Sequence, residues 1–168
     1  MASIRDVAKK AGVQLGFVFG LTSMLNATFR PLPTSFVFTP FITIGGMSGN
    51  WTSLLIAFVP RILLGYLAGL VYEQLQKKQV NNNVSIIAGA LTGIITNTVL
   101  VLGGIYLFFG AQYAQVAGVA YQALLGVLFG VVTTNGIAEA ILGAICCLVV
   151  CKAVAPATRK FKLADSSI

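Results

Sequence analysis

Residues 84–110 have the sequence VSIIAGALTGIITNTVLVLGGIYLFFG, a continuous apolar stretch without a charged side chain. A helix needs about 20 mostly apolar residues to cross a bilayer, because each residue adds about 1.5 Å to a hydrocarbon path of about 30 Å. This stretch, Val84–Gly110, therefore predicts a membrane-spanning helix. Three further stretches meet the same criterion and predict spans at Ala11–Thr28, Trp51–Gln76 and Gly136–Ala155.

The composition of the chain agrees with a membrane protein. Of its 168 residues, 57% are hydrophobic and 9% are charged, whereas soluble domains carry about 25% charged residues. The 18 glycines are typical of closely packed membrane helices. We predict an all-α integral membrane protein with one helical bundle at 11–155, preceded by a cytoplasmic segment at 1–10 and followed by a cytoplasmic basic tail at 156–168.

The net charge of +7 does not indicate nucleic-acid binding, because the basic residues lie between apolar stretches rather than on one face. The chain has no histidine, so it lacks the commonest general base and metal ligand. Cys146, Cys147 and Cys151 fall inside one apolar stretch, which favours buried thiols over disulfides or metal ligands. We expect no catalytic site, no cofactor and no metal.

The orientation of the spans follows from their flanking charges. Lys9 and Lys10 precede the first span and place that end in the cytoplasm. A fifth uncharged stretch, Ala111–Asn135, is predicted to stay on the outer side without a net crossing, because a full crossing would place the basic C-terminal tail outside. With this arrangement nine of the 11 basic residues lie inside, Arg30 lies outside and Arg61 lies within the membrane. Both termini are therefore expected in the cytoplasm.

Two long outer segments remain, Phe29–Asn50 and Ala111–Thr134. Both are apolar and rich in aromatic residues for surface loops. They are predicted either to cover a ligand cavity as a lid or to lie in the membrane interface as aromatic belts.

Two ionisable residues fall inside predicted spans, Arg61 after Pro60 and Glu139 at the start of the last span. An ionisable group at membrane depth is a functional hypothesis, because its burial is costly. The two residues either face a common outer cavity or form a structural ion pair. The amides of Asn97 and Asn135 suit a ligand rich in hydroxyl and amide groups, or hydrogen bonds between helices.

Five stretches together resemble the substrate-specific S components of energy-coupling factor (ECF) transporters, most closely the pantothenate-specific branch. They are GLTS at 20–23 with Asn26, TSFVFTPF at 34–41, VPRILLG at 59–65, TNTVLVLGG at 96–104 and NGIAE at 135–139. The resemblance covers about Ala11 to Val154.

The resemblance implies a six-helix protein that binds a vitamin, here pantothenate, on its outer side. It would dock on a transmembrane coupling subunit with two cytosolic ATPases and tip over in the membrane to release the vitamin inside. The four predicted spans correspond in order to helices three to six of that family. We therefore expect additional apolar sequence upstream of Ala11, where the first two helices of the family would lie.

A candidate substrate-binding set follows from the membrane-depth residues, the aromatic segments and the resemblance. It consists of Arg61, Asn97, Asn135, Glu139, Phe38, Thr39, Trp51 and Thr98.

Three alternatives to a pantothenate-binding subunit remain at this point. The ligand could be another vitamin such as riboflavin or folate. A small proton-coupled exporter of four helices would use Glu139 as its carboxylate. A membrane scaffold would need Arg61 and Glu139 only for stability.

Overall fold

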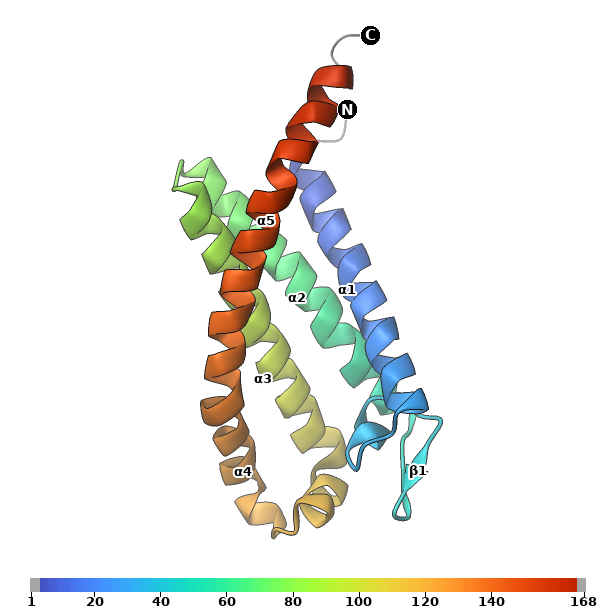
Figure 1. Ribbon diagram of the computed structural model, residues 1–168. Helices are drawn as coiled ribbons and strands as arrows, with labels where there is room; N and C mark the ends of the chain where they lie inside the picture. The colour runs from blue at the N-terminus through green and yellow to red at the C-terminus, as the bar shows by residue number, and fades with distance from the viewer. Residues whose placement is uncertain (1–3, 166–168) are drawn as a thin grey trace.

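The fold is taken from a computed structural model that describes residues 4–165, and the side chains of residues 10–154 except 131 and 135. Helices dominate this part of the chain, as the sequence predicts (Figure 1). They are α1 (Ile4–Phe29), α2 (Trp51–Lys77), α3 (Asn82–Ala117), α4 (Leu124–Val131) and α5 (Ile137–Asp165). A π-helical turn at Val132–Gly136 joins α4 to α5, so that the two form one long rod.

The connection between α1 and α2, residues 30–50, is the main irregular region. Pro31 and Pro33 follow the end of α1 at Phe29, because neither residue can continue a helix. The connection contains a short 3₁₀ helix (Ser35–Val37) and two antiparallel strands, β1 (Thr43–Ile44) and β2 (Met47–Ser48), in which Thr43 pairs with Ser48.

Helix α2 begins with a capping box. The Asn50 side chain accepts a hydrogen bond from the Thr52 amide at 2.8 Å, and the Ser53 hydroxyl accepts one from the Asn50 amide at 3.1 Å. These bonds satisfy amide groups that have no partner within the helix. The start of α2 is therefore fixed to the end of the connection.

Glycines bring α1 and α2 into backbone contact. A Cβ atom on Gly12 would overlap the carbonyl oxygen of Gly65, and one on Gly16 would overlap that of Arg61. One on Gly20 would lie 2.9 Å from the carbonyl oxygen of Ala57. The glycine repeat of the first span is thus the face that packs on α2.

Helices α2 and α3 are antiparallel and pack through small residues as well. A Cβ on Gly93 would lie 3.2 Å from Leu64 Cγ, and a Cβ on Gly104 would lie 3.0 Å from Ile56 Cγ1. The same register places every α2 residue between 56 and 64 opposite the α3 segment between 93 and 104.

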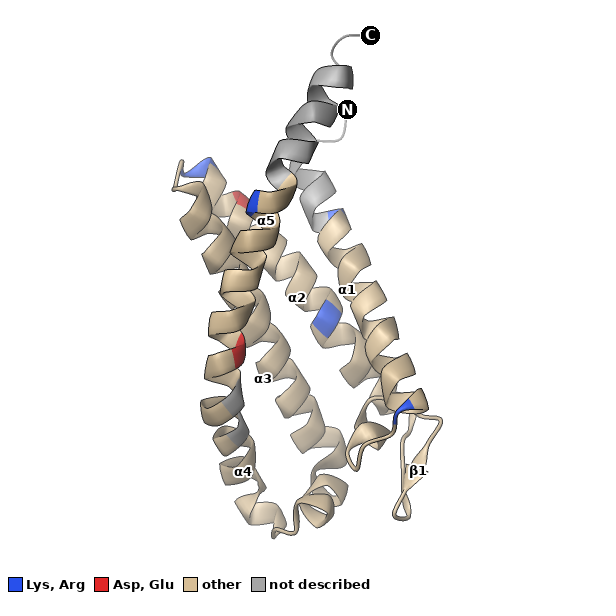
Figure 2. Ribbon diagram, viewed as in Figure 1, with Lys and Arg blue, Asp and Glu red and all other residues tan. Residues whose placement is uncertain are grey.

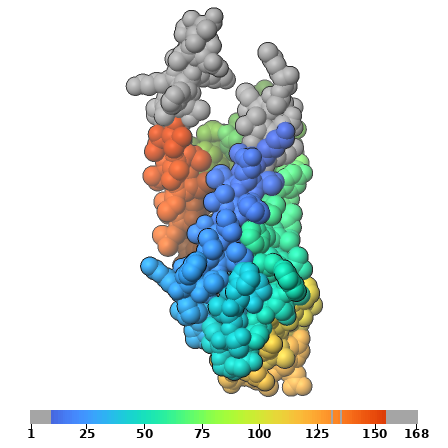
Figure 3. Space-filling view, turned by 90° about the vertical axis from the view of Figure 1, so that its right-hand side faces the viewer, coloured from blue at the N-terminus to red at the C-terminus, as the bar shows by residue number. Residues whose placement is uncertain are grey.

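The hydrophobic core joins the α1–α2 connection to the bundle. Its main cluster contains buried side chains from the connection, α2 and α3, namely Phe36, Val37, Ile56, Ile105 and Phe109. Figure 3 shows the connection gathered at one end of the bundle, against the ends of the helices. Phe36 and Val37 therefore hold this region in place and are not exposed in an interface belt.

The second predicted outer segment, Ala111–Thr134, is not a loop. Helix α3 continues to Ala117, and α4 begins at Leu124, so most of the segment is helical. The helix ends where Gly118 adopts a left-handed conformation with φ of 67°, which glycine tolerates. The chain reverses there (Figure 1), so the segment forms a helical hairpin.

Three helical stretches among the described residues are long and apolar enough to cross a membrane: Trp51–Lys77, Asn82–Ala117 and Tyr121–Val154. They confirm three of the four predicted spans, and the last begins earlier than predicted. The stretch Ala11–Thr28 is helical, but α1 is not among the three, because polar residues such as Gln14 and Asn26 lower its hydropathy.

The cysteines of the last helix are free. Cys147 is half-buried, but Cys146 and Cys151 are exposed on the surface of α5, so the prediction of buried thiols is wrong for these two. An apolar helix in a bilayer can leave such thiols facing lipid rather than protein.

Candidate functional site

Arg61 is buried in the middle of α2, with 7% of its surface exposed. The preceding residue, Pro60, lacks an amide hydrogen and therefore leaves the carbonyl of Ile56 without its helical hydrogen-bond partner. The Arg61 side chain takes over this carbonyl, because Nη1 donates a hydrogen bond to the Ile56 oxygen at 2.7 Å. The sequence Pro60-Arg61 thus creates a carbonyl acceptor and supplies its donor.

Two aromatic rings surround the guanidinium. Its Cζ atom lies 5.7 Å from the centroid of the Phe19 ring on α1 and 5.2 Å from that of Phe38 in the α1–α2 connection. Both are cation–π contacts, which stabilise a cation outside water. The Arg61 Nε atom is buried and has no hydrogen-bond partner. A buried N–H group without an acceptor is costly, which makes Nε a candidate donor to a ligand.

Thr39 lies next to Phe38 and fixes the connection to α1. Its buried hydroxyl is 2.7 Å from the hydroxyl of Thr28, near the end of α1. The Ser53 hydroxyl of α2 donates to the Phe36 carbonyl oxygen at 2.8 Å. These bonds hold the connection over the same end of α1 and α2, so that Phe38 stays on Arg61.

Asn97 on α3 lies at a similar depth to Arg61 on α2. Gly93 faces Leu64 and Gly104 faces Ile56, and positions 97 and 61 lie between these two contacts on their helices. Its side chain is half-buried, and its Oδ1 atom is buried without a hydrogen-bond partner. A buried amide oxygen needs a donor, which a hydroxyl or amide of a ligand can supply.

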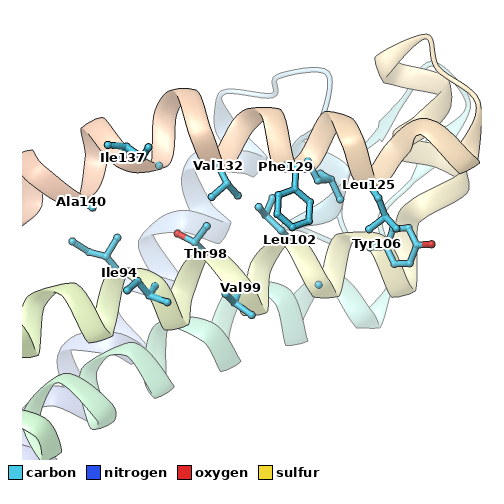
Figure 4. Close-up of a pocket in the computed structure, with 14 residues that line it drawn as sticks. Ile94, Thr98, Val99, Leu102, Tyr106, Leu125, Phe129, Val132, Ile137 and Ala140 are labelled. Atoms are coloured by element: carbon cyan, nitrogen blue, oxygen red, sulfur yellow. The ribbon is translucent and has the colours of Figure 1, made fainter.

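A cavity of about 450 Å³ lies between α3 and the α4–α5 rod (Figure 4). Its walls are almost entirely apolar, and Thr98 and Tyr106 are the lining residues that carry a side-chain hydroxyl. Figure 4 shows Thr98 and Leu102 on α3 opposite Val132 and Phe129. The full lining is Ile94, Ile95, Thr98, Val99, Leu102, Gly103, Tyr106, Leu125, Leu128, Phe129, Val132, Gly136, Ile137 and Ala140.

The structure brings only part of the predicted set together. Phe38 contacts Arg61, and Thr39 adjoins it, whereas Thr98 lines the separate cavity. Glu139 is exposed on α5, and no ion pair joins it to Arg61 among the described side chains. Figure 2 shows the few charged positions that lie away from the ends of the helices.

Two further predictions have different outcomes. Trp51 is 81% exposed at the start of α2 and does not contact Arg61. The Asn135 side chain lies outside the described residues, although its backbone belongs to the π-helical turn beside the cavity. A residue missed by the sequence reasoning is Phe19. It adjoins Gly20 on the packing face of α1, a signal that would have required knowing that α1 packs on α2.

The described side chains include no cluster of three His, Cys, Asp or Glu residues that could hold a metal ion. The groups that the described residues bring to the candidate site are one buried cation, a buried amide oxygen without a partner and an apolar cavity.

Residues 10–151 match the family described as "ECF transporter, substrate-specific component". The pantothenic acid transporter PanT of Lactococcus lactis subsp. cremoris (strain MG1363) is 42% identical over 139 residues, which cover 79% of this chain and 68% of the relative. No solved structure matches the chain.

Proposed function

Because this chain belongs to the family of substrate-specific components of ECF transporters, we propose that it captures pantothenate on the outer side of the cell membrane for import. A member of this family is a transport subunit and not an enzyme. The observation that carries the choice of ligand is Arg61, a buried cation that keeps one N–H group without an acceptor. The name of the similar Lactococcus protein supports pantothenate over riboflavin or folate.

The ligand's chemistry fits the groups available. Pantothenate has one carboxylate, two hydroxyls and an amide around an apolar centre. A guanidinium binds a carboxylate through two parallel hydrogen bonds. We assign the carboxylate to Arg61 and the neutral polar groups to Asn97 and Asn135.

Uptake against a gradient needs an energy source, and the sequence contains no phosphate-binding loop of an ATPase. We propose that the chain docks on a transmembrane coupling subunit that carries two cytosolic ATPases. Its helices α1, α2, α3 and the α4–α5 rod correspond in this proposal to helices three to six of the family arrangement.

The first prediction tests this assembly. When the tagged chain is purified from native membranes in mild detergent, two ATPase subunits and one polytopic membrane protein are expected to co-purify. The isolated chain is expected to bind radiolabelled pantothenate, and excess unlabelled pantothenate should displace it while riboflavin and folate do not. Uphill transport by the chain alone in liposomes would contradict the proposal, because it would require no coupling module.

The second prediction concerns orientation. Replacing the three native cysteines by serine and introducing one cysteine at position 160 should give a protein that a membrane-impermeant maleimide labels only after permeabilisation. The matched control is Ser48→Cys in β2, an exposed position at the opposite end of the bundle. It should react in intact cells, because that end is proposed to face outwards. The reverse labelling pattern would overturn the orientation with both termini in the cytoplasm.

A further inference from the structure

The geometry around Arg61 leaves one edge of its guanidinium for a ligand. A guanidinium donates hydrogen bonds in its plane, and it binds a carboxylate through either its two Nη atoms or its Nε and Nη2 atoms. Nη1 is engaged by the Ile56 carbonyl oxygen at 2.7 Å, whereas the buried Nε has no partner. The edge that combines Nε and Nη2 therefore has no hydrogen-bond partner among the described residues, and it is the edge that can donate two parallel hydrogen bonds to a carboxylate.

Two neighbours determine which edge this is. Pro60 releases the Ile56 carbonyl that holds Nη1, because a residue with an amide hydrogen at position 60 would bond that carbonyl within the helix. Phe19 contributes a ring 5.7 Å from Cζ and limits rotation of the group from the side of α1. Without either contact, a long side chain with several rotatable bonds would sample other orientations.

We infer that Pro60 and Phe19 are positioning residues, which hold Arg61 so that its Nε and Nη2 atoms receive the ligand's carboxylate. The inference rests on the proposed function, since it concerns how the same ligand is recognised. It assigns specificity for an anion to a proline and a phenylalanine that do not themselves contact the carboxylate.

The test measures selectivity rather than affinity alone. Pantothenate and its alcohol analogue, which has CH₂OH in place of the carboxylate, are titrated against the 168-residue chain in lipid nanodiscs. Pro60→Ala and Phe19→Leu are each expected to weaken pantothenate binding about three- to tenfold, because an unheld side chain must be ordered on binding. Binding of the alcohol should change less than about twofold, since it does not need the charged edge.

A double variant shows whether Pro60 affects pantothenate binding through Arg61. If Pro60 acts through Arg61, then Pro60→Ala should cause no further loss of pantothenate binding in an Arg61→Ala background. The thermal stability of Pro60→Ala should not fall, because alanine is the better residue in a helix interior. Phe41→Leu is the matched control: it removes an exposed ring from the α1–α2 connection and should leave both titrations unchanged.

The possible outcomes are distinguishable. If Pro60→Ala and Phe19→Leu keep the wild-type preference for the carboxylate while Arg61→Ala loses it, the positioning role is overturned and the proposed function stands. If Pro60→Ala does not fold, Phe19→Leu alone decides by the same criterion. If the wild-type chain binds neither ligand, the proposed function fails, and the inference fails with it.

Discussion

Arg61→Ala is expected to weaken pantothenate binding by about 2–5 kcal/mol, which is roughly a 30- to 5,000-fold increase in Kd. The reason is that the carboxylate would lose its only cation at a site from which water is largely excluded, since Arg61 is 7% exposed. Isothermal titration of the purified chain with pantothenate measures the effect. Arg61→Lys should recover only part of the loss, because an ammonium group cannot form the two parallel bonds.

The control for this substitution is Arg30→Ala, which removes an exposed cation at the end of α1. It should change the Kd little, because an exposed charge is screened by water and salt. If a folded Arg61→Ala protein bound pantothenate with unchanged affinity, Arg61 would serve the packing of α1, α2 and the connection instead of the ligand.

The second large effect is expected at Gly65, where α1 and α2 touch. A Cβ atom there would overlap the carbonyl oxygen of Gly12, so Gly65→Ala must push two backbones apart. Overpacking usually costs about 1–3 kcal/mol, and the upper end of that range, about 3 kcal/mol, is expected because no side chain can move aside. For a chain of this size this corresponds to a thermal midpoint lower by about 6–12 °C.

Gly126→Ala provides the comparison, since a Cβ on this helical glycine of α4 would meet nothing within 4 Å. Its thermal midpoint should stay equal or rise slightly, because alanine favours a helix over glycine. Equal melting of both variants with the wild type would mean that α1 and α2 are less closely packed than the structure shows.

The helical bundle could be predicted from hydropathy, because the cost of placing polar groups in a bilayer leaves a strong signal in each span. Both ends of α2 and the start of α3 lie close to the predicted ones: Trp51–Lys77 against Trp51–Gln76, and Asn82 against Val84. The end of α3 at Ala117 lies well beyond the predicted end at Gly110. The error at Ala111–Thr134 has a physical cause. Flanking charges report which side a segment returns to, but they do not distinguish an apolar loop from two helices joined at Gly118.

The candidate site was harder to predict than the fold. Arg61 was conspicuous because a charge at membrane depth is rare, and the structure shows that it is buried. Its surroundings depend on contacts between segments far apart in the sequence, such as Phe19 with residue 61, and no local pattern encodes such a pair. The aromatic side chains of the connection illustrate the same limit. Phe38 lies against Arg61 while Trp51 is exposed, although both belonged to the predicted binding set.

The exposed Trp51 is the only tryptophan of the chain, so it can serve as an intrinsic fluorescence probe of the protein's position in the bilayer. Indole emission shifts in colour with the polarity around the ring, and polarity changes steeply between lipid headgroups and acyl chains. Tilting of the bundle would move this ring along that gradient, because α2 begins at Trp51 and carries it rigidly. The fluorescence of the unlabelled protein can thus follow reorientation in the membrane in real time, with no engineered probe.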